Sequence, residues 1–365
     1  MTRFVQLHFL TVYPPSNPNR DDQGQPKQAE FGGVPRLRIS SQAIKRAART
    51  SDVFQNDLTG HLGERTQRFG EVVYDELLNA HGASEDRAGE IARQVADIFG
   101  ALKSAKDKTP RYIEQLAFIS PDERTAALDL AKRLLDGETV GEKDKKELEK
   151  QVLRTADGAV DVALFGRMLA DDPDFNRDAA AQVAHAMTTH RALVEDDFYT
   201  AVDDLKTPAE DAGAGFMGAL GFGSGVYYLY ANIDTRLLLE NLAGRADLAA
   251  RGAGALVEAL AISTPSGKRN SFAHHTRASY IRAESGQMQP RSLSGAFFKP
   301  VSDDDLLAAS IRATEDLAER FDRTYGPQAE ASAIMDVTRP EGTLQDIRGF
   351  VEQEVTRAAR ELSDG

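Results

Sequence analysis

The stretch FGGVPRLRISSQAIKRAAR, residues 31–49, predicts a turn, a short strand and a helix in succession. The glycine pair at 32–33 permits backbone conformations that other residues rarely adopt. Arg-Leu-Arg-Ile at 36–39 alternates with a period of two, so we expect both arginines on one strand face and the two apolar side chains toward the interior. Ser40 or Ser41 then caps the helix.

The predicted helix is basic on one face. The polar positions recur at i, i+3, i+4 and i+7, and they are Gln42, Lys45, Arg46 and Arg49. The opposite, buried face consists of Ala43, Ile44, Ala47 and Ala48. Free amides at the helix start, serine hydroxyls and fixed cations together suit a row of phosphates. The alternative is an ordinary solvated basic face.

This basic cluster lies in an acidic chain. Residues 27–49 hold six Lys and Arg against Glu30, a net charge of +5; all 365 residues sum to −13, so the remainder carries −18. A general nucleic-acid coater is therefore excluded, and RNA or DNA must bind at a local patch. The absence of Cys excludes disulfides and fits a reducing cytoplasm. No signal peptide is visible, and the apolar run at 4–13 is too short to span a membrane.

Periodicity predicts an α+β chain of about two domains. The expected strands are at 4–13, 36–39, 159–168, 181–189, 222–233 and 268–283. The expected helices are at 88–105, 111–119, 121–137, 142–156, 235–262, 303–323 and 343–362. Pro and Gly make 14–30 an irregular loop, and they make 191–222 an excursion, expected to be a β-hairpin arm.

Catalytic interpretations of the sequence are weaker than the phosphate-binding one. His185 and His190 lie five apart and would point to opposite faces of a strand, and adjacent His274 and His275 have the same problem as metal ligands. The glycine-rich run at 221–225 leads into a strand and is followed by no phosphate-loop lysine. We therefore expect structural or RNA-contacting histidines and a flexible hairpin.

Asp21 and Asp22 carry the strongest catalytic alternative. A carboxylate in a loop near RNA can activate a 2′-hydroxyl or hold a metal ion, which would make the protein a metal-dependent ribonuclease. The competing hypothesis is that an Asp at this position turns the loop or pairs with Arg20.

Several motifs together resemble a known family. They are NRDD at 19–22, FGG-x-x-R-x-R-ISSQ-x-x-KRA-x-R at 31–49, VDVALFGRM at 160–168, TTH at 188–190, TAVDDL at 200–205 and SGVYYLYANI at 224–233. In this order they are similar to the CasC-type backbone (Cas-seven family) subunit of the type I-E CRISPR Cascade complex. The resemblance implies an RRM-like (ferredoxin-like) antiparallel sheet palm at 1–59 and 158–365, a helical fingers insertion at 60–157, and a β-hairpin thumb arm at 191–222.

The resemblance also implies a function. Such a subunit is a non-catalytic RNA-binding component of a cytoplasmic antiviral ribonucleoprotein. Its expected partners are the CRISPR RNA (crRNA), other copies of itself in a helical filament, other Cascade subunits, and target DNA through the guide, with no membrane, cofactor or metal. Each copy holds one segment of guide RNA and presents it for pairing with DNA. Related type III backbone subunits cut RNA with an early-loop aspartate, whereas type I-E members are not known as nucleases.

The residues expected to bind RNA are Arg20, Lys27, Arg38, Ser40, Gln42, Lys45, Arg46, Arg49, Met168, Tyr199, Thr200, Lys268, Arg269 and Asn270. Met168 and the arm-root residues Tyr199 and Thr200 would contact a displaced nucleotide, and core packing is the alternative role for them. Three lysines on a fingers helix, Lys143, Lys145 and Lys146, are the expected contacts to DNA. Acidic residues interleave them, so charge alone predicts only an exposed, ion-paired helix.

Overall fold

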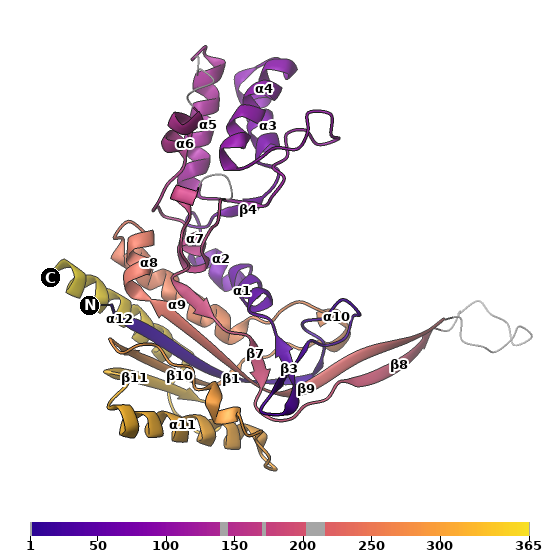
Figure 1. The fold of residues 1–365 in the computed structure, drawn as a ribbon, viewed down its shortest axis with the longest axis vertical. Coiled ribbons are helices and arrows are strands. Elements are labelled where there is room, and N and C mark those ends of the chain that lie inside the picture. The colour runs from indigo at the N-terminus through magenta and orange to yellow at the C-terminus, as the bar shows by residue number, and fades with distance from the viewer. Residues whose placement is uncertain (1, 139–144, 170–172, 202–215, 365) are drawn as a thin grey trace, which may run out of the picture. The chain divides into compact units, whose positions relative to one another are not determined.

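The computed structural model describes residues 2–138, 145–169, 173–201 and 216–364. They form a mixed α+β protein with a large antiparallel sheet (Figure 1). The chain divides into two compact units. The first comprises residues 1–54, 182–232 and 253–354, and the second comprises 55–181, 233–252 and 355–365. The predicted insertion at 60–157 falls entirely in the second unit.

One sheet dominates the first unit. Its strand order is β11 (Ala331–Asp336), β10 (Ala278–Gly286), β1 (Phe4–Ser16), β9 (Phe216–Asp234), β7 (Ala186–Thr188), β3 (Val34–Ile39) and β2 (Gln28–Phe31), while β6 (Ala181–Val183) and β8 (Glu195–Ala201) also pair with β9. The pairs β11–β10, β10–β1, β9–β7, β7–β3, β3–β2 and β8–β9 are antiparallel. Strands β8 and β9 form the expected hairpin arm, whose predicted tip falls outside the described residues.

Alternating side chains cover both faces of this sheet. On one face, Leu10, Tyr228 and Tyr280 pack with Ile311 of helix α11 (Leu306–Tyr325) and with the short helix η3 (Ser294–Phe297). On β1, the alternate residues Val5, Leu7 and Phe9 are fully buried. The predicted strand at 4–13 is therefore confirmed, while the intervening Gln6 and His8 are buried as well, so both faces of β1 are covered.

The second unit is mainly helical. Its elements are α2 (Asp52–Asp57, at the unit boundary), β4 (Glu64–Thr66), α3 (Phe69–His81), α4 (Glu85–Ala96), η1 (Asp97–Phe99), β5 (Ala117–Ile119), α5 (Pro121–Leu135), α6 (Lys145–Val152), α7 (Val160–Phe165), η2 (Pro173–Phe175) and α8 (Thr235–Asn241). Apolar residues such as Val73, Ile91 and Leu130 form its core. Ser120 and Glu123 make a capping box at α5, as expected for a helix with Pro at its first position. Helices α9 (Ala246–Ile262) and α12 (Leu344–Ser363) have residues in both units.

Four secondary-structure predictions are wrong. The helix expected at 88–105 ends with η1 at Phe99, and residues 100–105 are not helical. Residues 160–165 form a helix where a strand was predicted. Nearly every side chain there is buried, so the sequence carries no periodicity that would distinguish a helix from a strand. Residues 111–116 form turns that lead into β5. At 268–283 a short helix, α10 (Arg269–Phe272), precedes β10. No helix among the described residues is long and apolar enough to cross a membrane.

Candidate nucleic-acid interface

Arg36 is buried, contrary to the prediction that it shares an exposed face with Arg38. Its side chain is 0% exposed, and its guanidinium donates to the carbonyl oxygens of Phe31, Thr188 and Phe297 at 3.2, 3.1 and 2.8 Å. Two of these acceptors come from segments distant in sequence, β7 and η3. The alternating pattern of the strand therefore could not reveal that Arg36 is buried. Arg36 ties the β2–β3 hairpin to the body of the first unit.

The turn before β3 is held equally closely. Gly32 has φ +63°, and a Cβ atom there would lie 1.7 Å from the carbonyl oxygen of Phe298. A side chain at position 32 would clash with Phe298, which explains why this position is glycine. Together with Arg36, this close approach fixes the direction in which β3 enters the following helix.

Helix α1 (Ser41–Arg49) begins where the sequence predicted. The Ser40 hydroxyl caps it by accepting from the Ala43 amide at 3.3 Å, while the Ser41 amide donates to His185 Nδ1 at 2.9 Å. The amides of Ser41 and Ala43 are thus already occupied, which corrects the expectation of free amides at the helix start. Ser40 itself is buried, and a role for it in binding RNA stays a prediction.

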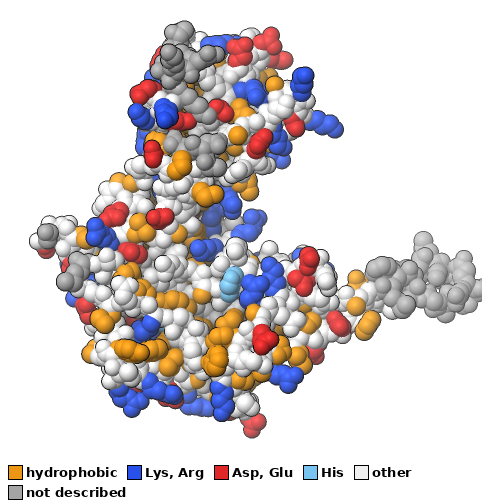
Figure 2. Space-filling view, in the orientation of Figure 1, with side chains coloured by type: hydrophobic (Ala, Val, Ile, Leu, Met, Phe, Trp, Pro, Cys, Tyr) orange, Lys and Arg blue, Asp and Glu red, His pale blue; other side chains and the backbone are white. Residues whose placement is uncertain are grey.

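The cations predicted from the sequence gather around α1 and β3. Arg20, Gln42 and Arg46 are exposed, and Lys27, Arg38, Lys45 and Arg49 are half-buried. Figure 2 shows Lys and Arg side chains beside a histidine over the region where Figure 1 places these two elements. Excluding buried Arg36, five cations in 27–49 remain against Glu30, a net charge of +4. We call this set the basic surface. Burial lowers the pKa of Lys45.

His185 reports on the electrostatics of this surface. Its Nδ1 accepts from the Ser41 amide and lies 3.3 Å from the Arg38 guanidinium. Desolvation, then the charges of Arg38 and Lys27, lowers the pKa of His185 below its ordinary value of 6.5. Protonation would replace the Nδ1 lone pair and remove both contacts.

We expect the ring signals of His185 to titrate below pH 6.5 by NMR. Because the folded-state pKa is the lower one, the unfolded chain binds this proton more tightly. The stabilising contribution of neutral His185 is therefore complete above pH 6.5 and is lost as the pH falls through the folded-state pKa. A His185→Asn variant identifies the signal by its absence. A midpoint at or above 6.5 would contradict a positive potential here.

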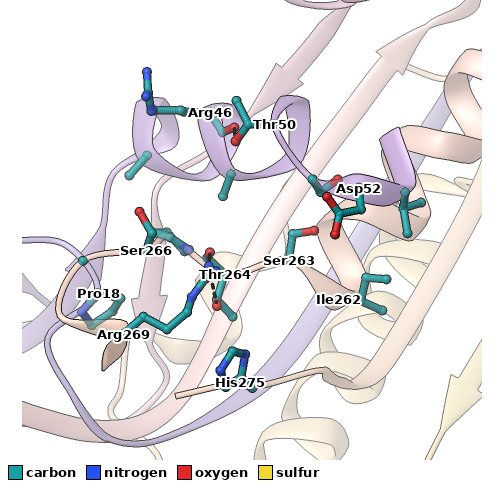
Figure 3. Close-up of a pocket in the computed structure, with 16 residues that line it drawn as sticks. Pro18, Arg46, Thr50, Asp52, Ile262, Ser263, Thr264, Ser266, Arg269 and His275 are labelled. Carbon is teal, nitrogen blue, oxygen red and sulfur yellow. Dashed lines mark hydrogen bonds between the residues drawn. The ribbon is translucent and has the colours of Figure 1, made fainter. Parts of the chain in front are cut away.

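A groove of about 490 Å³ adjoins the basic surface. Figure 3 shows Arg46 of α1 and Thr50, which caps the end of α1, on one side and Thr264, Ser266 and Arg269 on the other. The structure thus brings Arg46 and the predicted helper Arg269 to one groove. The Arg269 guanidinium donates to the Thr264 carbonyl, so Arg269 is also a structural residue.

The other two residues predicted to assist RNA binding, Lys268 and Asn270, flank Arg269 in the sequence. Lys268 is half-buried and adopts a left-handed conformation (φ 53°), and Asn270 is exposed. The sequence did not predict the hydroxyl-bearing part of the groove lining, which includes Thr50, Ser51, Thr264 and Ser266. Isolated Ser and Thr residues carry no motif that would have found them.

The remaining predicted contacts occupy other surfaces. Tyr199 and Thr200 are exposed on β8 of the arm. Met168 follows α7 in the second unit and is 76% exposed, so core packing does not explain it. Lys146 is exposed on α6, whereas Lys143 and the Lys145 side chain fall outside the described residues.

Asp21, His190 and His274 have structural partners. Asp21 Oδ1 accepts from the amides of Gln23 and Gln25, both at 2.9 Å, and so closes the turn, while Asp22 is exposed. His190 Nε2 accepts from the Val226 amide at 3.2 Å, and the buried His274 ring contacts the Pro265 carbonyl. Within the described part of the chain, no three His, Asp or Glu side chains are placed to share a metal ion.

Fold and site define an α+β protein that carries a local basic surface on an acidic body. The sequence matches the family of CT1975-like proteins over residues 5–358, and the chain belongs to this family. One similar solved structure is a chain of a "CRISPR RNA-guided surveillance complex, pre-nicking", with 29% identity, a TM-score of 0.83, and coverage of 97% of this chain and 100% of that one. A second, from a "CRISPR RNA-guided surveillance complex", has 25% identity, a TM-score of 0.61, and coverage of 97% and 99%. A comparison with curated proteins gave no match. The resemblance noted from the sequence is thereby confirmed.

Proposed function

We propose that this chain is a non-catalytic, crRNA-binding backbone subunit of a type I-E CRISPR surveillance complex. The observation that carries the proposal is the basic surface around α1, which concentrates a net charge of +4 on a chain of −13. Two similar structures come from complexes described as RNA-guided, which supports RNA as the ligand.

The chemistry of the basic surface suits the backbone of RNA. Its cations, Lys27, Arg38, Lys45, Arg46 and Arg49, present charges that suit phosphates. Phosphate contacts carry no sequence information. A guide of any sequence would therefore bind equally well. Base pairing between the guide RNA and the target strand then reads the DNA sequence, as in other RNA-guided effectors.

In this proposal the sheet of the first unit is an RRM-like palm, the helices of the second unit are fingers, and the β8–β9 arm is a thumb. Copies line up along the RNA. Exposed Met168 of one copy and the arm residues Tyr199 and Thr200 of the neighbouring copy would hold a displaced nucleotide, because an apolar wedge stabilises an unstacked base. Each copy would thus present a short segment of guide.

The proposal includes no catalysis. A ribonuclease would need the Asp21 carboxylate to act on a 2′-hydroxyl or on a metal ion. Asp21 Oδ1 already accepts hydrogen bonds from two backbone amides, which favours a structural role for Asp21. Asp22 is exposed and belongs to the same turn.

Purification of the protein with its cellular partners tests the proposal. We expect a small RNA of uniform length to co-purify, and we expect it to remain uncut during incubation with Mg²⁺. The Asp21→Asn/Asp22→Asn variant should carry RNA of the same length. The proposal fails if no RNA co-purifies, or if Mg²⁺ shortens the RNA with the native protein and not with the variant.

A further inference from the structure

Met168 is an exposed apolar side chain in a segment whose neighbouring residues are buried. It follows α7 in the second unit and is 76% exposed, whereas Arg167 and Leu169 on either side are 5% and 4% exposed. A flexible apolar thioether normally packs against nearby apolar surface, because its removal from water is favourable. The exposure of Met168 therefore needs a cause in the structure around it.

Hydrogen bonds fix the backbone on both sides of Met168. The Arg167 amide donates to the Arg177 carbonyl at 3.0 Å, and the Arg177 amide donates to the Arg167 carbonyl at 2.9 Å. On the other side, the Leu169 amide donates to the side-chain oxygen Oδ1 of Asn176 at 2.6 Å. The backbone between these bonds has little freedom, so residue 168 is held at the surface.

The Arg167 side chain anchors one end of this segment to the rest of the second unit. Its guanidinium donates to the Glu123 carboxylate at 2.5 Å and to the carbonyl oxygens of Phe118, Arg154 and Phe175 at 3.2, 3.1 and 3.1 Å. The two charged side chains are 1% and 0% exposed. A buried ion pair is often no more stable than apolar residues of the same volume, so stability alone does not explain it. Its many hydrogen bonds do define one geometry for residue 167.

A small hollow lies beside Met168. Its volume is about 40 Å³, and Phe99, Leu116 and Leu169 contribute to its lining. A hollow of this size holds roughly three water molecules, which is room for the end of a methionine side chain and too little for a nucleobase. If the backbone at 167–169 were free, Met168 would turn into this hollow, because burial of its apolar surface is favourable.

We propose that Asn176 is a positioning residue that keeps Met168 out of the hollow and available to an unstacked base. The inference rests on the proposed function, in which Met168 is the wedge beside the displaced nucleotide. Asn176 itself contacts no RNA and acts through the Leu169 amide. It belongs to the second unit, whereas the phosphate-binding helix α1 belongs to the first.

Oxidation of methionines by dilute hydrogen peroxide tests this inference on the full chain without RNA. Asn176 is exposed, so Asn176→Ala should fold normally while it removes the acceptor of the Leu169 amide. Met168 should then oxidise severalfold more slowly than in the native chain, as measured by mass spectrometry, because it is buried in the hollow. Asn176→Asp keeps an acceptor oxygen and should restore the native rate. Met288, which is 47% exposed in the first unit, is the internal reference.

A second measurement follows the base itself. The guide RNAs carry 2-aminopurine, an adenine analogue that fluoresces more strongly when it is unstacked, at successive positions. With the native chain we expect a strong rise at recurring positions, and Asn176→Ala should lose most of that rise while Asn176→Asp retains it. RNA affinity should change far less than the fluorescence. The matched control Asn79→Ala replaces another exposed asparagine of the second unit and should behave as the native chain does in both measurements.

Equal oxidation of Met168 in the native chain and in Asn176→Ala would overturn the inference, and so would an Asn176→Asp variant that behaves as Asn176→Ala does. A native complex that binds RNA without any rise in fluorescence would contradict the role of Met168 as a wedge. If the native chain binds no RNA, the proposed function fails, and the oxidation rates still decide whether Asn176 positions Met168.

Discussion

Replacing Lys45, Arg46 and Arg49 with Ala is expected to lower the affinity for single-stranded RNA roughly 100-fold at about 0.1 M salt. The three cations lie on one face of α1, and each phosphate contact contributes ~0.7 to the slope of log affinity against log salt for single strands. The slope should therefore fall by about 2. The loss should be equal for RNAs of unrelated sequence, because phosphates carry no sequence information.

The salt titration should be run with two unrelated RNAs and with a matched control. Arg312, Arg320 and Arg323 also lie on one helix of the first unit, α11, and are exposed, so their replacement with Ala removes the same charge elsewhere. We expect this control to bind RNA nearly as the native chain does. A loss that depends strongly on RNA sequence, or an equal loss in the control, would count against binding of phosphates at α1.

The second large effect concerns stability. Arg36→Ala should lower the free energy of unfolding by about 3–5 kcal/mol, because it leaves a cavity and removes the donor of three carbonyl oxygens, two of them in buried hydrogen bonds. The melting temperature should fall by about 5 °C. Thermal denaturation followed by circular dichroism measures this change.

Arg38, two residues along the same strand, is the control for Arg36. It is half-buried, so Arg38→Ala should cost less than about 1 kcal/mol of stability while weakening RNA binding. The two arginines, which have the same side chain and lie on one strand, should thus separate stability from binding. Equal destabilisation by the two variants would show that the buried hydrogen bonds of Arg36 do not hold the β2–β3 hairpin in place.

The parts of the fold that local sequence encodes were predictable. Helix α1 has a serine cap and a period of 3.6, and both signals lie within ten residues. Strand β1 and helix α5 likewise carry their own alternation or capping box. The cations of α1 were found for the same reason, since their common face follows from spacing alone.

Features that depend on distant segments were not predictable. Arg36 is covered by β7 and η3, which nothing in 34–39 indicates. The amide of Ser41 is occupied by His185, which comes from another part of the chain. Helix α7 is buried on every side, so its sequence lacks the polar stripe by which a helix is recognised.

Ultraviolet crosslinking shows which residues of the protein contact the RNA. The complex is purified with its RNA and irradiated, and the peptides that become attached to nucleotides are identified by mass spectrometry. We expect crosslinks to peptides that contain residues 38–49, in which Arg38 and the polar face of α1 lie. Crosslinks confined to other segments, with none in β3 or α1, would contradict this expectation.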